Sequence, residues 1–218
     1  MLQQIQTLFL KELTLEWRNR YALNGMLLYV VSTVFVCYLS FRQITSVPVW
    51  NALFWIIMLF ASINAVGRSF IQEHKGRLLY FYSTCSPQAF VLAKMAYNAV
   101  IMWFIGLLGY VIYFLFIGDL VQDHIMFGLA LFLGSTGFAL ILTLMSAIAS
   151  KTDNNLSLMA ILSFPVQLPF LMTLIKLSKN AVDGLDPTLS YGLVLILIMI
   201  IVIVVALSYI LFPYLWRD

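Results

Sequence analysis

The sequence predicts an all-α integral membrane protein, a bundle of six transmembrane helices that follows an N-terminal interfacial helix. Of its 218 residues, 63% are hydrophobic and only 10% are charged, a balance unlike that of soluble domains. Six apolar runs of about 20 residues are long enough, as helices, to cross a hydrocarbon core of about 30 Å. The sequence does not show the alternating segments of about ten residues that mark a transmembrane β-barrel.

The first twenty residues predict the interfacial helix. Apolar side chains recur there at helical spacing, while most glutamine and charged side chains occupy the rest of the helix surface. Such a helix lies on the membrane surface before the first crossing. It either only anchors the chain or also contacts a cytoplasmic subunit. The apolar set is Leu2, Ile5, Leu8, Phe9 and Leu13.

The six predicted crossings account for most of the chain. The connections between them are too short to hold a second domain, so we expect a single transmembrane domain over residues 1–218. The expected crossings lie near residues 21–41, 49–67, 95–117, 125–149, 156–177 and 189–212.

The distribution of Lys and Arg predicts the orientation, because positive residues near helix ends are retained in the cytoplasm. With the N-terminus inside, nine of the twelve fall on the cytoplasmic side and only Arg42, Lys176 and Lys179 on the other. We therefore expect both termini in the cytoplasm. The net charge of +3 follows from this topology and gives no indication of a nucleic-acid partner. The cytoplasmic set is Lys11, Arg18, Arg20, Arg68, Lys75, Arg77, Lys94, Lys151 and Arg217.

The longest polar interruption, residues 68–94, is a cytoplasmic loop in this topology. Ser86 occupies a helix N-cap position and Pro87 the first helical position, where its missing N–H is not needed. A helix is therefore expected to begin near residue 87. Its first turns, with Phe90 and Lys94, are expected in the cytoplasm or at the interface. There an amphipathic helix either docks into a groove of a cytoplasmic protein or rests on the headgroups.

Small residues in the fourth expected crossing predict close helix packing. Ala130 and Gly134 have the spacing of a small-xxx-small pair, and Gly137 follows. The neighbour is either another helix of the chain or a second copy. Asn64 and Asn98, near helix ends, are expected to form hydrogen bonds between helices.

The fifth expected crossing contains two prolines. Pro165 and Pro169 each remove a backbone donor and are expected to kink the helix. Gln167 lies between them, a polar side chain in an apolar run. The kink is either a packing solution or a hinge that moves during function.

No catalytic or nucleotide-binding motif occurs in the sequence: GxxxxGK[ST], HExxH and GxSxG are all missing. The nine acidic residues lie outside or at the ends of the crossings, so no carboxylate is placed to bind a coupling ion. We therefore expect a non-enzymatic chain that draws energy from another subunit, and no metal site. His124 is either a solvated residue near a helix end or a haem contact, since imidazole can ligate haem iron.

Three segments, in this order, resemble the CcmB family, the haem exporter B permeases of the cytochrome c maturation system. They are Phe9-Leu-Lys-Glu12, the loop that ends in Phe90-Val-Leu-Ala-Lys94, and Phe164-Pro-Val-Gln-Leu-Pro-Phe170. The resemblance covers nearly the whole chain. It implies an ABC-2-type permease in the bacterial inner membrane, with ATP bound and hydrolysed on a separate subunit, CcmA.

The resemblance also implies the further partners and the role of the loop. CcmC is implied as a membrane partner, the haem chaperone CcmE as an indirect one, and haem as a candidate cargo, with no cofactor bound by the chain itself. A second copy or another membrane subunit would complete the exporter. The loop would couple to the ATPase. The implied coupling positions are Glu73, Gly76, Pro87 and Lys94, to which the apolar face of the loop adds Phe90.

Two functional classes follow. In the first, the chain couples ATP hydrolysis to haem export or to release of the haem-loaded chaperone. In the second, it is a passive scaffold or channel that only recruits a cytoplasmic protein.

Overall fold

The computed structural model describes residues 1–18, 20–41, 46–67, 70, 85–151 and 155–217, and all regular structure in these ranges is helical. The absence of strands among them agrees with the predicted class. The helices are α1 (Leu2–Arg18), α2 (Arg20–Ser40), α3 (Val47–Val66), α5 (Pro87–Ile117), α6 (His124–Ala149), α7 (Asn155–Val182), the 3-10 helix η1 (Pro187–Ser190) and α8 (Tyr191–Arg217).

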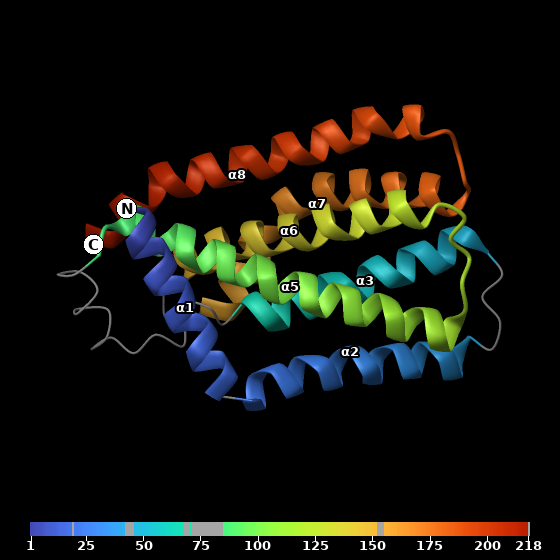
Figure 1. Cartoon of the computed structure of the whole chain (residues 1–218), viewed down its shortest axis with the longest axis horizontal. Coiled ribbons are helices and arrows are strands. Elements are labelled where there is room, and N and C mark those ends of the chain that lie inside the picture. Colours follow the sequence, from blue (N-terminus) through green and yellow to red (C-terminus); the bar gives the residue numbers. More distant parts are fainter. Residues whose placement is uncertain (19, 42–45, 68–69, 71–84, 152–154, 218) are drawn as a thin grey trace.

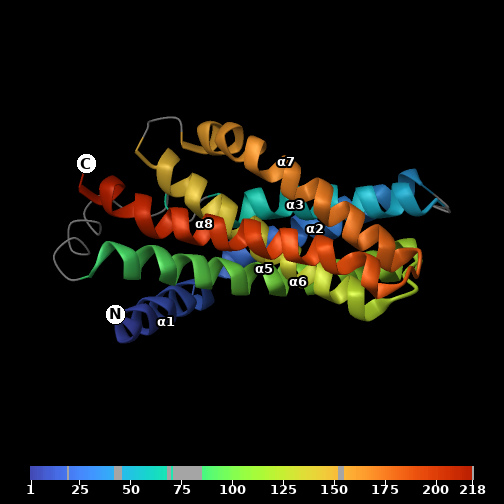
Figure 2. The same cartoon turned by 90° about the horizontal axis from the view of Figure 1, so that it is seen from above.

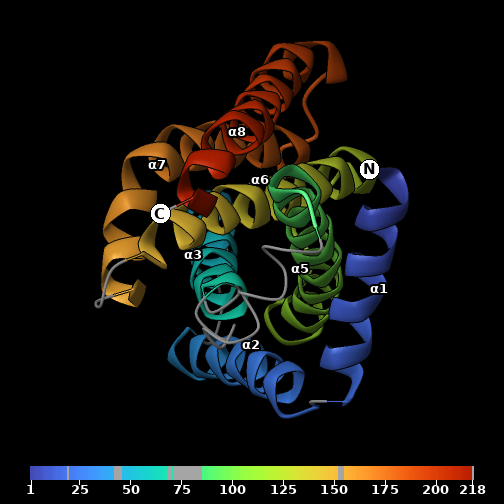
Figure 3. The ribbon, with the colours of Figure 1, turned by 90° about the vertical axis from the view of Figure 1, so that its left-hand side faces the viewer.

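The long helices lie side by side along one axis, and both chain termini lie at the same end of the bundle (Figure 1). We call this the terminal end and the opposite one the far end. Helix α1 runs across the terminal end against α5, on the side of the bundle opposite α7 (Figures 2 and 3). This position, oblique to the bundle axis, is the one expected for an interfacial helix.

Five helices in the described part of the chain are long and apolar enough to cross a membrane: Val47–Val66, Pro87–Ile117, His124–Ala149, Ser157–Val182 and Pro187–Trp216. The expected first crossing is the helix α2, in which the fully described stretch Asn24–Ser40 is apolar but shorter than these five. At 1.5 Å per residue this stretch spans about 26 Å, less than a hydrocarbon core of about 30 Å. The chain is therefore a multi-pass helical membrane protein, and five of its described helices have the length and composition of a crossing.

Helix boundaries follow local sequence signals. Pro87 begins α5 as expected, with Ser86 at the N-cap position in extended backbone. The Ser86 hydroxyl does not cap the helix; it donates instead to Gln4 Oε1 of α1 at 3.2 Å. Asp123 caps α6 by accepting the N–H groups of the second and third residues of the helix, both at 3.0 Å. Gly118 ends α5 with a positive φ of 98°, a conformation that favours glycine.

Helix α6 forms the centre of the bundle, in contact with α3, α5, α7 and α8 (Figure 3). Of its apolar stretch 61% is buried, against 17% for α8. Two glycines permit the close approach of its neighbours. A Cβ on Gly134 would lie 2.7 Å from the Trp55 ring of α3, and one on Gly137 would collide with Phe170 of α7. Ala130 is fully buried on the same helix.

A polar network joins α3 to α7 near the far end. Trp55 Nε1 donates to Ser178 Oγ at 2.7 Å, and Ser178 Oγ donates to Asn51 Oδ1 at 2.8 Å. Asn51 Nδ2 in turn donates to the carbonyl oxygen of Ile175 at 2.8 Å. Because these buried groups satisfy one another, they are accommodated inside an apolar bundle without loss of hydrogen bonds.

Of the two asparagines expected between helices, one is confirmed. Asn98 Nδ2 of α5 donates to Thr143 Oγ1 of α6 at 2.8 Å. The expectation for Asn64 is wrong. Its side chain is exposed and donates to the Phe60 carbonyl one turn earlier in the same helix, at 3.0 Å.

Candidate functional site

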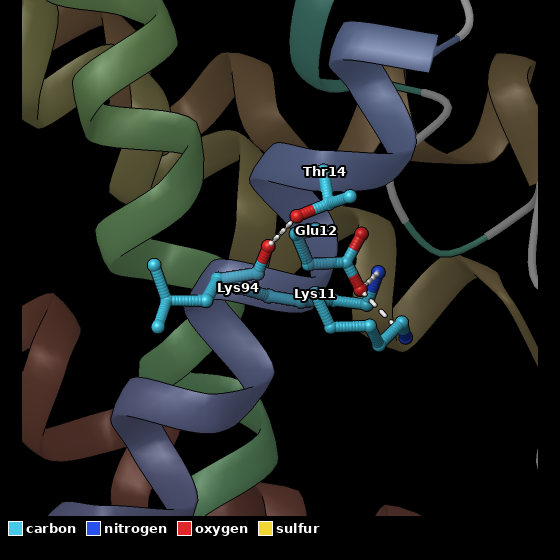
Figure 4. Close-up of polar contacts among 5 residues, drawn as sticks. Lys11, Glu12, Thr14 and Lys94 are labelled. Atoms are coloured by element: carbon cyan, nitrogen blue, oxygen red, sulfur yellow. Dashed lines mark hydrogen bonds and ion pairs between the residues drawn. The ribbon is translucent and has the colours of Figure 1, made fainter.

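The candidate site lies at the terminal end, where α1 crosses the beginning of α5. Lys94 Nζ of α5 lies 3.4 Å from Glu12 Oε1 of α1, and Lys11 Nζ lies 3.0 Å from the same oxygen. Figure 4 shows the Glu12 carboxylate beside the two lysine side chains. The site thus joins two segments that are 82 residues apart in the sequence.

Helical spacing accounts for this meeting. In α1, Leu8 is buried, and Glu12 follows it by one turn on the same face, which packs on α5. In α5, Phe90 and Lys94 are likewise one turn apart and both face the interior of the chain. A charged residue on the inner face of each helix therefore meets the other.

The ion pair is largely removed from solvent. The Lys94 side chain is 3% exposed and that of Glu12 14%. The Lys94 ammonium also lies 5.2 Å from the centre of the Phe70 ring and 5.5 Å from that of Phe90, within the range of cation–π attraction. A buried charge of this kind is tolerated only because opposite charge and ring faces replace its hydration.

The charges set the ionisation of the carboxyl group. Burial raises the pKa of Glu12, but the positive charges of Lys94 and Lys11, together with their hydrogen bonds, outweigh it and hold that pKa below its ordinary value of 4.5. Glu12 is therefore ionised at neutral pH, and the α1–α5 contact is a pair of full charges.

The predicted coupling positions divide into two groups. Pro87, Phe90 and Lys94 are described, and the last two are buried within the chain. Glu73 and Gly76 lie outside the described residues. The first turns of α5 are not an independent docking helix: they continue without interruption to Ile117, and Ala89, Phe90 and Val91 are buried.

Sequence reasoning missed Glu12 as a member of this site. The available signal was a carboxylate one turn after Leu8, on the apolar face of a helix that otherwise keeps its charges elsewhere. A carboxylate on a buried face requires a cation on the helix that covers that face, because charged side chains are rarely buried unless they are paired.

The two prolines of α7 do not end the helix, which is continuous from Asn155 to Val182. Pro165 and Pro169 are exposed on its outer side, while Gln167 is only 4% exposed. Gln167 Nε2 has no hydrogen-bond partner among the described residues. The structure thus places a buried amide with an unused donor in the segment where two backbone donors are missing.

His124 lies at the far end with both ring nitrogens near polar groups. Nδ1 is 3.3 Å from the Tyr110 hydroxyl, and Nε2 is 3.5 Å from Asp119 Oδ2. In the part of the chain that the structure describes, no three His, Cys, Asp or Glu side chains gather as metal ligands. These two contacts orient the imidazole at the start of α6.

Comparison with known proteins adds one finding. The family model described as CcmB protein matches residues 3–213, a range that includes nearly all of α1, the ion pair, the proline segment of α7 and most of α8. No curated protein matches the sequence.

Proposed function

The chain belongs to the CcmB family, and from this premise we propose that it is the membrane permease subunit of an ATP-driven ABC complex in cytochrome c biogenesis. Family membership makes it a component of the cytochrome c maturation haem export system. The proposal adds the mechanism: ATP is hydrolysed on the separate subunit CcmA. The chain passes the resulting motion to its helices, to export haem or to release the haem-loaded chaperone CcmE.

The observation that carries the proposal is the buried Glu12–Lys94 pair. It lies where the loop 68–94 ends and joins that point to α1, so a force on the loop reaches two helices together. Direct contact with the ATPase is proposed for Glu73, Gly76 and Pro87. For Phe90 and Lys94, which are buried, we propose a role in passing that contact on to the rest of the bundle.

The proposed topology has six crossings, with α2 as the first. Over its full helical range, Arg20–Ser40, α2 has 21 residues. This corresponds to about 32 Å, enough for a crossing. The two termini lie at one end, as an even number of crossings requires (Figure 1). The Lys and Arg distribution favours the cytoplasm for that end, and we propose the inner membrane as the location.

Further proposals concern the other subunits and the hinge. A second copy of the chain or another membrane subunit, with CcmC as an associate, would complete the translocation unit. Pro165, Gln167 and Pro169 are proposed as the hinge of α7, supported by the unused Gln167 donor. Haem remains the proposed cargo, and any contact of His124 with it requires the ring to leave Asp119.

The alternative is a passive scaffold or channel that recruits a cytoplasmic protein without ATP-driven work. None of the long helices described here, α2, α3, α5, α6, α7 and α8, contains Asp or Glu. Ion-coupled transporters usually carry such a group inside the membrane, so an external source of energy fits this chain better than self-powered transport.

The test is purification of the chain with CcmA after co-expression, followed by measurement of ATP turnover in membrane vesicles. Glu73→Gln and Pro87→Ala are expected to lower turnover of the assembled complex by about fivefold or more, the size of an ordinary allosteric coupling. Lys151→Gln, an exposed site beyond α6, is the matched control and should leave turnover unchanged. If CcmA does not co-purify, or if its ATP turnover is the same in the loop variants as in the wild type, the passive scaffold is the better description.

A further inference from the structure

Four aromatic rings close the terminal end of the bundle beside Lys94. We call Phe70, Phe90, Phe212 and Trp216 the ring cluster. The Phe90 ring centre lies 6.2 Å from that of Phe70, 6.1 Å from that of Phe212 and 5.0 Å from that of Trp216. Phe70 and Phe212 are 5.8 Å apart, and Phe212 and Trp216 are 5.5 Å apart. Every ring therefore contacts at least two others at the separation typical of aromatic pairs.

The cluster unites three segments that are distant in the sequence. Phe70 stands shortly after α3, Phe90 lies in the first turn of α5, and Phe212 and Trp216 lie in the last turns of α8. Phe70, Phe90 and Phe212 are 7%, 1% and 4% exposed. Phe70 and Phe90 thus stand on either side of residues 71–84 of the proposed coupling loop. Both rings contact aromatic rings of α8.

Helix α8 has few other buried positions. Only 17% of its apolar stretch is buried, so much of its length faces away from the other helices of the chain. Phe212 and Trp216, one turn apart, share the inner face of its end, whereas Tyr214 between them is 69% exposed. The ring cluster is therefore a major attachment of α8 at the terminal end.

We infer that Phe212 and Trp216 are positioning residues for coupling, which tie the end of α8 to both bases of the coupling loop. Aromatic side chains have only two rotatable bonds and a fixed shape, so a shift of Phe90 or Phe70 displaces the rings packed on them instead of being absorbed by side-chain bending. The last helix thereby moves with the loop. This inference rests on the proposed function and deepens it by adding α8 to the elements that transmit motion.

The test uses the complete complex with its ATPase subunit in vesicles, and compares Phe212→Leu and Trp216→Leu with Tyr214→Leu. The measured quantity is haem exported, or haem-loaded chaperone released, per ATP hydrolysed, with the amount of co-purified ATPase recorded for each variant. Both inner variants are expected to lower the ratio by about fivefold or more. Tyr214→Leu should leave it unchanged, and Trp216→Phe, which keeps a ring, should retain most of it.

A second measurement does not depend on the stability of the leucine variants. The difference between the fluorescence of the wild-type complex and that of Trp216→Phe isolates the emission of Trp216. This emission should change when the ATPase is trapped with nucleotide. An unchanged Trp216 signal, or an equal loss of coupling in Tyr214→Leu, overturns the inference.

Different outcomes refute the proposed function and the role of α8. A wild-type complex with neither ATP-dependent haem export nor ATP-dependent chaperone release refutes the proposed function. A wild-type complex that couples normally, with inner variants that behave like Tyr214→Leu, refutes only the role of α8.

Discussion

The Glu12–Lys94 pair permits a quantitative prediction by a double-mutant cycle. Glu12→Gln and Lys94→Met each remove one charge and keep the approximate size of the side chain. Two unit charges 3.4 Å apart attract by about 5 kcal/mol at an effective dielectric constant of about 20. Loss of hydration offsets part of this attraction, so we expect a coupling energy of about 1–3 kcal/mol between the two sites.

The matched control is the cycle of Glu12 with Lys11. The Lys11 ammonium is nearer to the carboxylate, at 3.0 Å, but its side chain is 27% exposed against 3% for Lys94. Since solvent screening and side-chain entropy reduce exposed pairs, the coupling of Lys11→Met with Glu12→Gln should stay below about 1 kcal/mol. Burial, and not distance, therefore decides which cycle gives the larger value.

The assay is unfolding by SDS in mixed micelles, followed by tryptophan fluorescence, with all variants measured at pH 7. A coupling energy near zero for Glu12 and Lys94 refutes the reasoning, because the pair would then contribute no more than two independent side chains. A larger coupling for Lys11 than for Lys94 refutes the role assigned to burial.

Three further predictions follow from the described contacts. Because the pKa of Glu12 is lowered in the fold, the loss of stability caused by Lys94→Met should be constant above pH 4.5. This loss should shrink as the pH falls through the lowered pKa of Glu12, and unfolding titrations at a series of pH values measure it. Gly137→Ala should destabilise the bundle by about 1–3 kcal/mol, since its Cβ meets an aromatic ring of α7, whereas Gly128→Ala has open space and should be neutral or stabilising by the same assay. Gln167→Leu should raise stability by about 1 kcal/mol, because it removes a buried donor without a partner among the described residues. A loss of stability in this variant would contradict that reasoning. Lower ATP-driven release in the same variant would indicate that the segment moves as a hinge.

The helices were predictable from the sequence because lipid leaves so few alternatives. A long apolar segment can satisfy its backbone in a membrane only as a helix or in a closed barrel, and the Ser86–Pro87 signal placed the start of α5 at the right residue. The first expected crossing is the exception, because the stretch of α2 from Asn24 to Ser40 is shorter than the other five apolar helices.

The contacts of the site were not predictable in the same way. The sequence pattern around an apolar residue such as Phe90 is the same whether lipid, a partner protein or another helix of the chain covers its side chain. Its burial depends on Phe212 and Trp216, more than 120 residues later in the chain. The different environments of Asn64 and Asn98 have the same origin. Both are asparagines in apolar segments, and only the packing of α5 on α6 distinguishes them.

The polar network of Trp55, Asn51 and Ser178 holds α3 against α7 near the far end of the bundle. Hydrogen bonds weaken steeply with distance and angle, so α3 and α7 resist sliding or rotation where this network joins them. We therefore expect α3 and α7 to stay together near the far end during any motion that begins at the terminal end.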